Sequence, residues 1–195
     1  MGENMDNMDK KADQSKQTNK TGFEKDFGID LSTGSSGIEK AIEMGINIEE
    51  AGRKFYMEKA AQANIPQVQH HLKRLAEDEI MHTKILQELK ESLMGKGEWI
   101  GVKELPDTKK RLEELAAFKP GKGPKVEDTS SAIEVLNEAL KLEDRVSKFY
   151  RGLADELKTD KGQAFFQKLA DWEQGHYKLI KKLIEVVHGF EGTWG

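Results

Sequence analysis

The most constraining feature of this chain is a pattern of four residues that occurs twice, 94 positions apart. Each copy has a glutamate, a tyrosine seven positions later, and a Glu-x-x-His further along the chain. The tyrosine ends a Lys-Phe-Tyr triplet in both copies, so the flanking residues repeat as well. Such a repeat predicts two equivalent halves. The first copy is Glu49, Tyr56, Glu79 and His82, and the second is Glu143, Tyr150, Glu173 and His176.

Four glutamates and two histidines in two matched sets are a complete ligand list for a pair of first-row metal ions. One Glu-x-x-His on a charged helix is weak support, but two copies at one offset, each with an upstream glutamate, are far more specific. Four buried carboxylates without cations would overwhelm a fold stable by about 5–15 kcal/mol, whereas two divalent cations balance their formal charge. The predicted metal ligands are therefore Glu49, Glu79, His82, Glu143, Glu173 and His176.

Composition narrows the class of protein. A chain of 195 residues can form one domain with a sizeable core, or at most two small ones. The net charge of −4, with both signs interspersed, does not indicate a nucleic-acid partner. The absence of cysteine excludes disulfides, thiolate metal sites, iron–sulfur clusters and thiol catalysis. No long apolar run or secretory signal is present, so we expect no membrane partner and a cytoplasmic protein.

The distribution of apolar residues predicts an all-α fold. Residues 1–36 are polar and show no apolar period, which predicts a disordered tail. Residues 37–188 carry amphipathic patterns that predict four long helices, and residues 189–195 form a C-terminal tail. The start and stop signals place these helices at about 38–63, 66–94, 131–157 and 162–187.

The connection between the second and third helices is long. Residues 95–129 hold Gly, Pro and Lys clusters around one short helical stretch at about 107–118. A connection of this length is unusual in a compact domain unless it crosses along the molecule. The expected architecture is therefore an antiparallel four-helix bundle of two helical hairpins joined by a long crossover connection.

Helical geometry allows the repeated ligands to meet. At about 100° per residue, Glu49 lies roughly 40° and Glu143 roughly 35° from the centre of the apolar stripe of its helix. From the turn near Asn64, Glu49 is 15 residues back and Glu79 is 15 residues forward. The same count holds for the second half about Lys158. The ligands of both hairpins should therefore lie at one height inside the bundle.

Several neighbouring residues bear on the site. Tyr56 and Tyr150 lie on the same face as their glutamates, and they are either core aromatics with a satisfied hydroxyl or functional residues. A hydroxyl bond to a ligand carboxylate would suit both interpretations. Asp78 could accept the outer N–H of a ligand histidine, and its equivalent is Trp172, so the two metal positions should differ. The basic stretches, including Lys109-Lys110-Arg111, are interpreted as solvated loop charges.

These residues resemble the ferritin-like di-iron carboxylate superfamily. Within it, the Phe-Tyr after the first glutamate and the Leu-Ala-x-x-Glu-x-x-His are most similar to the rubrerythrin branch. The resemblance covers about residues 38–188 and implies a ferritin-like bundle with two iron ions per chain. It also implies that Glu79 and Glu173 bridge the ions while Glu49 and Glu143 are terminal. Manganese in one or both positions stays open, because oxygen-rich ligation accommodates it.

The resemblance implies a di-iron oxidoreductase that reduces hydrogen peroxide or dioxygen. Rubrerythrins usually carry a four-cysteine rubredoxin-like domain, and without cysteine we expect electrons from an external donor protein. Val146 stands where rubrerythrins often have a further carboxylate, which leaves a six-ligand set closer to bacterioferritin-type ferroxidases. Two alternatives stay open: a ferroxidase for iron storage and detoxification, which requires a hollow shell, and a non-catalytic metal-binding or structural bundle. We also expect a homo-oligomer, with a dimer favoured.

Overall fold

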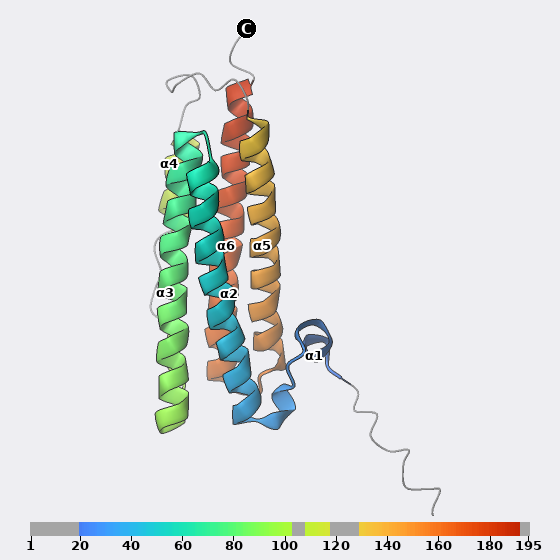
Figure 1. Ribbon diagram of the computed structural model, residues 1–195. Coiled ribbons are helices and arrows are strands. Elements are labelled where there is room, and N and C mark those ends of the chain that lie inside the picture. Colours follow the sequence, from blue (N-terminus) through green and yellow to red (C-terminus); the bar gives the residue numbers. More distant parts are fainter. Residues whose placement is uncertain (1–19, 103–107, 118–128, 192–195) are drawn as a thin grey trace, which may run out of the picture.

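A computed structural model of the chain describes residues 20–102, 108–117 and 129–191. Four long helices lie side by side in a bundle (Figure 1). They are α2 (Ser35–Gln62), α3 (Pro66–Lys96), α5 (Ser130–Glu156) and α6 (Asp160–Glu191). The main packing partners are α2 with α3 and α5 with α6, so each half of the sequence forms one antiparallel hairpin. The all-α fold is confirmed, and the described residues contain no strand.

The two hairpin turns are built alike. At the first turn, the Gln69 side chain donates from Nε2 to the carbonyl oxygen of Ala63 at 2.7 Å. At the second turn, Gln163 donates to the carbonyl oxygen of Leu157, also at 2.7 Å. Gln163 and Leu157 each lie 94 positions after Gln69 and Ala63, so the repeat extends to the turns. These bonds satisfy carbonyl groups that the helix ends leave free.

The helix limits agree closely with those predicted from the sequence. Pro66 opens α3, where its fixed φ and missing N–H suit the first helical turn. The same helix ends before Gly97, whose φ of 68° is left-handed. The largest difference lies at the end of α6, which continues to Glu191 and therefore replaces the first part of the predicted C-terminal tail. Residues 192–195 lie outside the described part of the chain.

The N-terminal segment corrects one prediction. The sequence predicts a disordered tail over residues 1–36, of which 1–19 lie outside the described residues. The remainder is structured, with helix α1 (Gly22–Phe27) and the 3₁₀ turn η1 (Leu31–Thr33) leading directly into α2. The polar composition of this segment does not predict its structure, because a short helix needs few apolar residues when these pack against the helical bundle.

Local signals and packing explain α1. The Thr21 side chain accepts from the backbone N–H of Glu24 at 3.1 Å, and Gly28 ends the helix with a left-handed φ of 72°. Phe23 and Phe27, one turn apart, lie against Phe149 of α5 with ring centroids 5.7 and 5.1 Å away. Burial of these rings stabilises a segment too short to be helical alone.

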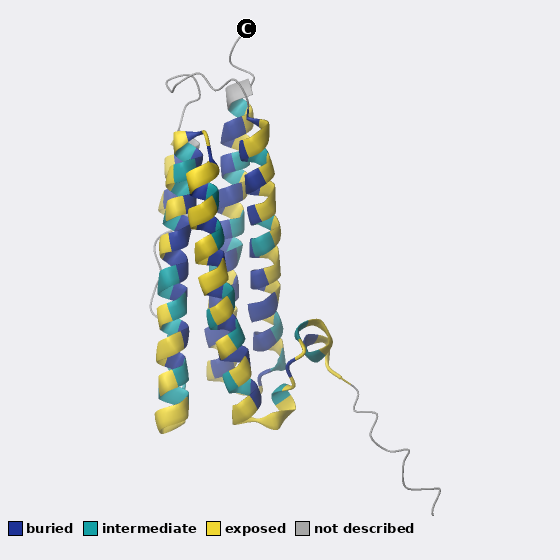
Figure 2. Ribbon diagram, in the orientation of Figure 1, coloured by how far each residue is buried: buried dark blue, intermediate teal, exposed yellow. Residues whose placement is uncertain are grey.

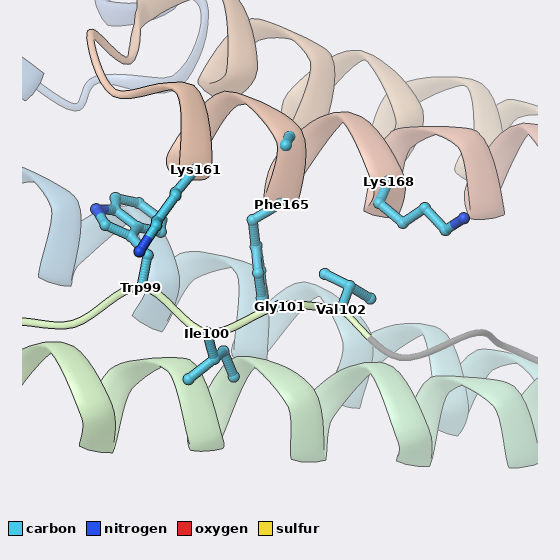
Figure 3. Close-up of a pocket in the computed structure, with 8 residues that line it drawn as sticks. Trp99, Ile100, Gly101, Val102, Lys161, Phe165 and Lys168 are labelled. Atoms are coloured by element: carbon cyan, nitrogen blue, oxygen red, sulfur yellow. The ribbon is translucent and has the colours of Figure 1, made fainter.

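The described parts of the crossover lie beside α3 and α6. Residues 99–102 pass beside the first turns of α6 (Figure 3), where the Trp99 ring lies 6.4 Å from Phe165 and 6.2 Å from Phe166. The predicted short helix is present as α4 (Thr108–Ala117), which packs mainly against α6 and buries Leu115. Residues 103–107 and 118–128 are outside the described part of the chain.

The buried faces of the long helices point inward and form two apolar clusters along the bundle axis (Figure 2). One cluster includes Leu72, Leu136 and Leu183, and the other includes Ile42, Leu86 and Phe166. On every long helix, buried polar residues occupy the positions between the two clusters. The bundle therefore holds a polar layer at mid-height. Among the described helices, none has the length and hydropathy needed to span a membrane.

Candidate dinuclear metal centre

All six residues predicted as ligands meet in the mid-height polar layer, and each is buried. Helices α2 and α5 contribute one glutamate each, and helices α3 and α6 contribute a glutamate and a histidine each. The six residues form two overlapping sets, in each of which one ligand atom per residue lies within 4.8 Å of the others. The sets are Glu49, Glu79, His82 and Glu173, and Glu79, Glu143, Glu173 and His176.

Two glutamates belong to both sets because each divides its oxygens between the two histidines. Glu173 places Oε1 2.8 Å from Nδ1 of His82 and Oε2 3.3 Å from Nδ1 of His176. Glu79 places Oε2 3.1 Å from Nδ1 of His82 and Oε1 3.7 Å from Nδ1 of His176. This is the disposition that a carboxylate needs to bridge two ions.

The other two glutamates each face one histidine. Oε2 of Glu49 lies 3.3 Å from Nδ1 of His82, and Oε2 of Glu143 lies 3.6 Å from Nδ1 of His176. The two imidazole rings stack with centroids 5.3 Å apart and planes 15° from parallel. Both histidines therefore direct Nδ1 into the carboxylate cluster, and the arrangement follows the repeat.

The unpaired atoms of the cluster fit divalent cations. Among the described residues, Oε2 of Glu79, Oε2 of Glu143, Oε1 of Glu173 and Nδ1 of His176 lie close to one another's carboxylate or imidazole groups but make no hydrogen bond of good geometry. Buried polar atoms normally have partners, so a group of such atoms directed at one another indicates a missing positive charge. Carboxylate oxygens with two imidazole nitrogens suit iron or manganese better than soft, thiolate-preferring metals.

Each tyrosine of the repeat bonds to the first glutamate of the repeat in the other half. The Tyr56 hydroxyl of α2 donates to Oε1 of Glu143, and the Tyr150 hydroxyl of α5 donates to Oε1 of Glu49. Burial and the neighbouring carboxylates raise the pKa of both phenols well above the ordinary value of 10, so both hydroxyls keep the proton they donate. A Cβ atom at Gly45 would lie 3.3 Å from the Tyr150 hydroxyl, which explains the small residue there.

Asp78 contacts the outer nitrogen of one histidine, as the sequence predicted. Its Oδ2 lies 3.3 Å from Nε2 of His176. The same carboxylate accepts two hydrogen bonds from the guanidinium of Arg111 on α4, one from Nη1 to Oδ2 and one from Nη2 to Oδ1 at 2.8 Å. Burial raises the pKa of Asp78, but the bonds from His176 and Arg111 outweigh it and hold that pKa below its ordinary value.

The position of Arg111 corrects the interpretation of this residue as a solvated loop charge, whereas the neighbouring Lys110 is exposed. Arg111 is buried, with only 9% of its surface exposed. A signal was present in the sequence, because Arg111 lies one helical turn before the buried Leu115 and so shares its face of α4. A buried carboxylate at Asp78 also needs a cationic partner, and the repeated residues of the site include no arginine or lysine that could be one.

The other histidine of the cluster, His82, has different surroundings. Trp172, which takes the place of Asp78 in the repeat, stacks on the His82 ring with centroids 5.4 Å apart and planes 12° from parallel. Nε2 of His82 has no hydrogen-bond partner among the described residues. The two halves of the site therefore differ behind the histidines, in agreement with the sequence prediction.

Without cations, the cluster redistributes protons. Burial raises the pKa of Glu143 to about 8, with Glu173 adding to the rise and His176 opposing it. Burial and the carboxylates of Glu173 and Glu49 also raise the pKa of Glu79 well above its ordinary value. Burial favours neutral imidazoles, but the surrounding carboxylates outweigh it and raise the pKa of His82 and His176.

Glu173 responds in the opposite direction. Burial favours its neutral form, but the charges and hydrogen bonds of both histidines outweigh that effect and hold the pKa of Glu173 below its ordinary value. The metal-free cluster thus favours protons on Glu79, Glu143 and both imidazoles and a negative charge on Glu173.

A surface pocket of about 410 Å³ lies apart from this centre, between residues 99–102 and the first turns of α6 (Figure 3). Its lining includes Trp99, Val102, Phe165 and the side chains of Lys161 and Lys168. None of its lining residues belongs to the six-residue cluster. The candidate centre is thus a closed polar layer within the bundle and not part of this surface pocket.

Comparisons with known proteins match the chain to a family profile and to a solved fold. A family profile described as Rubrerythrin matches residues 40–120 and 134–192, which include all six cluster residues and both tyrosines. A solved structure of a hypothetical protein from Pyrococcus furiosus has 24% sequence identity and a TM-score of 0.57, covering 83% of this chain and 97% of that chain. At that identity the likeness concerns the fold. No curated protein matches the chain.

Proposed function

The chain belongs to the rubrerythrin family, and from this premise we propose that it is a di-iron oxidoreductase that reduces hydrogen peroxide or dioxygen. The observation that carries the proposal is the division of the Glu79 and Glu173 oxygens between the two imidazoles. A bundle that needed only a structural ion pair would not direct both oxygens of two buried carboxylates at two separate nitrogen ligands.

The residues divide into two ligand groups and a shared pair. Glu49 and His82 would hold one ion, Glu143 and His176 would hold the other, and Glu79 with Glu173 would contact both. Two divalent ions balance the four carboxylates in formal charge, which makes the pair electrostatically suited to a buried layer. Iron follows from the family, while the same oxygen-rich ligands accommodate manganese in one or both positions.

When bound, a pair of ferrous ions supplies the two electrons that, with two protons, convert one hydrogen peroxide molecule to two water molecules. Tyr56 and Tyr150 keep Glu143 and Glu49 in place by donating hydrogen bonds, and the high pKa of each phenol keeps that proton on oxygen. Asp78 accepts from Nε2 of His176 and so directs Nδ1 toward the carboxylates. The apolar clusters above and below the layer limit the access of water.

Electrons for a second turnover have to come from outside the described site. The sequence contains no cysteine, so it offers no thiolate redox centre that could feed the cluster. We propose a separate electron-donor protein as the reductant. A homodimer is proposed as the working assembly, because a bundle of this kind does not need a storage shell to reduce a small oxidant.

Stopped-flow oxidation of the anaerobic ferrous protein tests the proposal. Stoichiometric hydrogen peroxide should oxidise it faster than equimolar dioxygen, because a ferrous pair matches the two-electron demand of peroxide. Glu143→Ala should abolish the fast phase while the far-ultraviolet circular dichroism stays helical. The matched control is Asp144→Ala, which removes the next carboxylate along the chain. Asp144 is exposed, and among the described residues its ion pair is with Lys148 at 2.6 Å.

The same experiment separates the rival functions. Faster oxidation by dioxygen, together with retention of hundreds of ferric ions per assembly, would indicate a ferroxidase for iron storage. Failure to bind iron at two ions per chain, with the fold intact, would contradict a dinuclear enzyme and leave a structural bundle. Metal analysis of protein purified without added metal identifies the native ions.

A further inference from the structure

We propose that Arg111 is a positioning residue that acts through Asp78 on His176, and that its action makes the Glu143/His176 position the first of the two to bind a metal ion. The inference rests on the dinuclear site of the proposed function and adds to it an order of binding. It also gives the crossover connection, which supplies none of the six candidate ligands, a part in the metal chemistry.

The first support is the geometry of the Arg111–Asp78 pair. Two parallel N–H···O bonds from one guanidinium fix the plane of a carboxylate as well as its position. Fixed in this way, Oδ2 of Asp78 lies 3.3 Å from Nε2 of His176. An acceptor at Nε2 holds the proton on that nitrogen and fixes the ring with Nδ1 facing the cluster, so Nδ1 is the nitrogen left to bind a metal ion.

The second support is the absence of such an arrangement on the other side. Nε2 of His82 has no hydrogen-bond partner within the described part of the chain, and its ring is placed by stacking between Trp172 and His176. Stacking fixes the plane of an imidazole but does not select which nitrogen carries the proton. Within the described residues, Nε2 of His82 therefore lacks an acceptor that would hold its proton when a metal ion binds Nδ1, whereas Nε2 of His176 already has Asp78.

Residues behind a ligand change metal affinity measurably. Loss of such a partner typically weakens binding about 10- to 100-fold. The three residues Arg111, Asp78 and His176 are all buried, so water does not readily replace a missing member of the chain of contacts. Removing Arg111 would leave the carboxylate of Asp78 without the two bonds that hold its plane, and the His176 position should then lose its advantage.

A competing explanation is that Arg111 only attaches α4 to the bundle. Two other contacts perform that task without touching Asp78. Leu115 buries its side chain in the apolar cluster that includes Leu72. Arg74 of α3 pairs with Glu114 of α4 at 3.1 Å. Variants at these positions loosen α4 but leave the Asp78–His176 contact, so they serve as matched controls.

The test is a titration of ¹⁵N-histidine-labelled, metal-free protein with Zn²⁺, followed by NMR of the ring nitrogens. Zinc is diamagnetic and does not change oxidation state, so the measurement is independent of turnover. His82→Gln and His176→Gln assign the two ring signals among the five histidines of the chain. In the unmodified protein, the Nδ1 signal of His176 should shift with the first equivalent of zinc and that of His82 with the second.

The variants separate positioning from attachment. Arg111→Gln and Asp78→Asn should each weaken the first binding step about 10- to 100-fold, so that the two histidines respond together. Arg111→Lys keeps the charge but not the paired bonds, and should recover only part of the affinity. Leu115→Ala and Arg74→Gln should leave the order unchanged.

Several results would overturn the inference. These are simultaneous shifts of His82 and His176 in the unmodified protein, an unchanged order in Arg111→Gln, full recovery in Arg111→Lys, or the same loss in Leu115→Ala. Zinc binding at two equivalents per chain in any order leaves the dinuclear site of the proposed function standing. No binding of zinc or ferrous iron by the folded protein would contradict the dinuclear site itself, and the inference with it.

Discussion

Removal of metal should make the stability of this protein fall as pH rises. In the metal-free fold, the pKa of Glu143 rises from 4.5 to about 8, first because the carboxyl is buried and then because Glu173 is close. Between these two values the folded chain keeps a proton that the unfolded chain has already released. The folded state therefore binds more protons, and the free energy of unfolding decreases as pH increases through this window.

The size of the effect follows from the shift. One pKa unit corresponds to about 1.4 kcal/mol, so Glu143 alone removes on the order of 5 kcal/mol between pH 4.5 and pH 8. The raised pKa values of His82 and His176 act in the same direction above their ordinary 6.5. Glu173 acts oppositely, because its lowered pKa makes stability fall as pH drops below 4.5. For a fold stable by about 5–15 kcal/mol, the loss is large.

Urea unfolding followed by circular dichroism, at intervals between about pH 5 and pH 8, measures this dependence. The chelator-treated protein should lose stability across the range. The metal-loaded protein should gain it, because metal binds the deprotonated ligands and competes with protons. Glu143→Gln removes one titrating group and should flatten the metal-free slope by about 1.4 kcal/mol per pH unit. Parallel curves for the metal-free and metal-loaded proteins would refute the reasoning.

Two further predictions follow from single contacts. Tyr56→Phe and Tyr150→Phe each leave a buried carboxylate oxygen without its donor. Each should therefore lower the free energy of unfolding by about 1–3 kcal/mol in denaturant titrations. A negligible loss in both variants would mean that the hydroxyls do not stabilise the fold. Gly152→Ala would place a Cβ atom 2.8 Å from Cδ2 of Phe23, so α1 should detach from α5 and become sensitive to limited proteolysis while the four-helix bundle stays intact. Protection of α1 equal to that of the unmodified protein would contradict this docking.

Much of the site could be predicted from the sequence because it depends on spacing along helices. Glu49 and Glu79 lie equally far from one turn, and Glu143 and Glu173 lie equally far from the other, so antiparallel pairing brings them to one height. The contact between Asp78 and the histidine of the facing helix followed from the same reasoning. Helix limits were predictable where Pro66 or a terminal glycine marks them.

The parts that could not be predicted depend on tertiary docking. Arg111 lies in a connection whose path along the bundle is set by packing, and neither the repeat nor its composition places it beside Asp78. The sequence does not predict helix α1 because Phe23 and Phe27 are isolated apolar residues in a polar segment. They stabilise the helix only by packing on the ring of Phe149, which lies far along the chain. In both cases the sequence offers one i, i+4 pair, which indicates a helix face but not what that face packs against.

The crossed bonds between the halves have a consequence for how such a site can change over time. Tyr56 holds Glu143 and Tyr150 holds Glu49, so neither hairpin completes its own half of the centre. If two identical hairpins assembled as a symmetric dimer, every substitution would appear on both sides at once. A single chain that contains both copies is free of this restriction, and one copy can acquire Asp78 while the other acquires Trp172. Joining the two halves in one polypeptide thus allows two neighbouring, equally ligated positions to diverge in chemistry without any change in the ligands themselves.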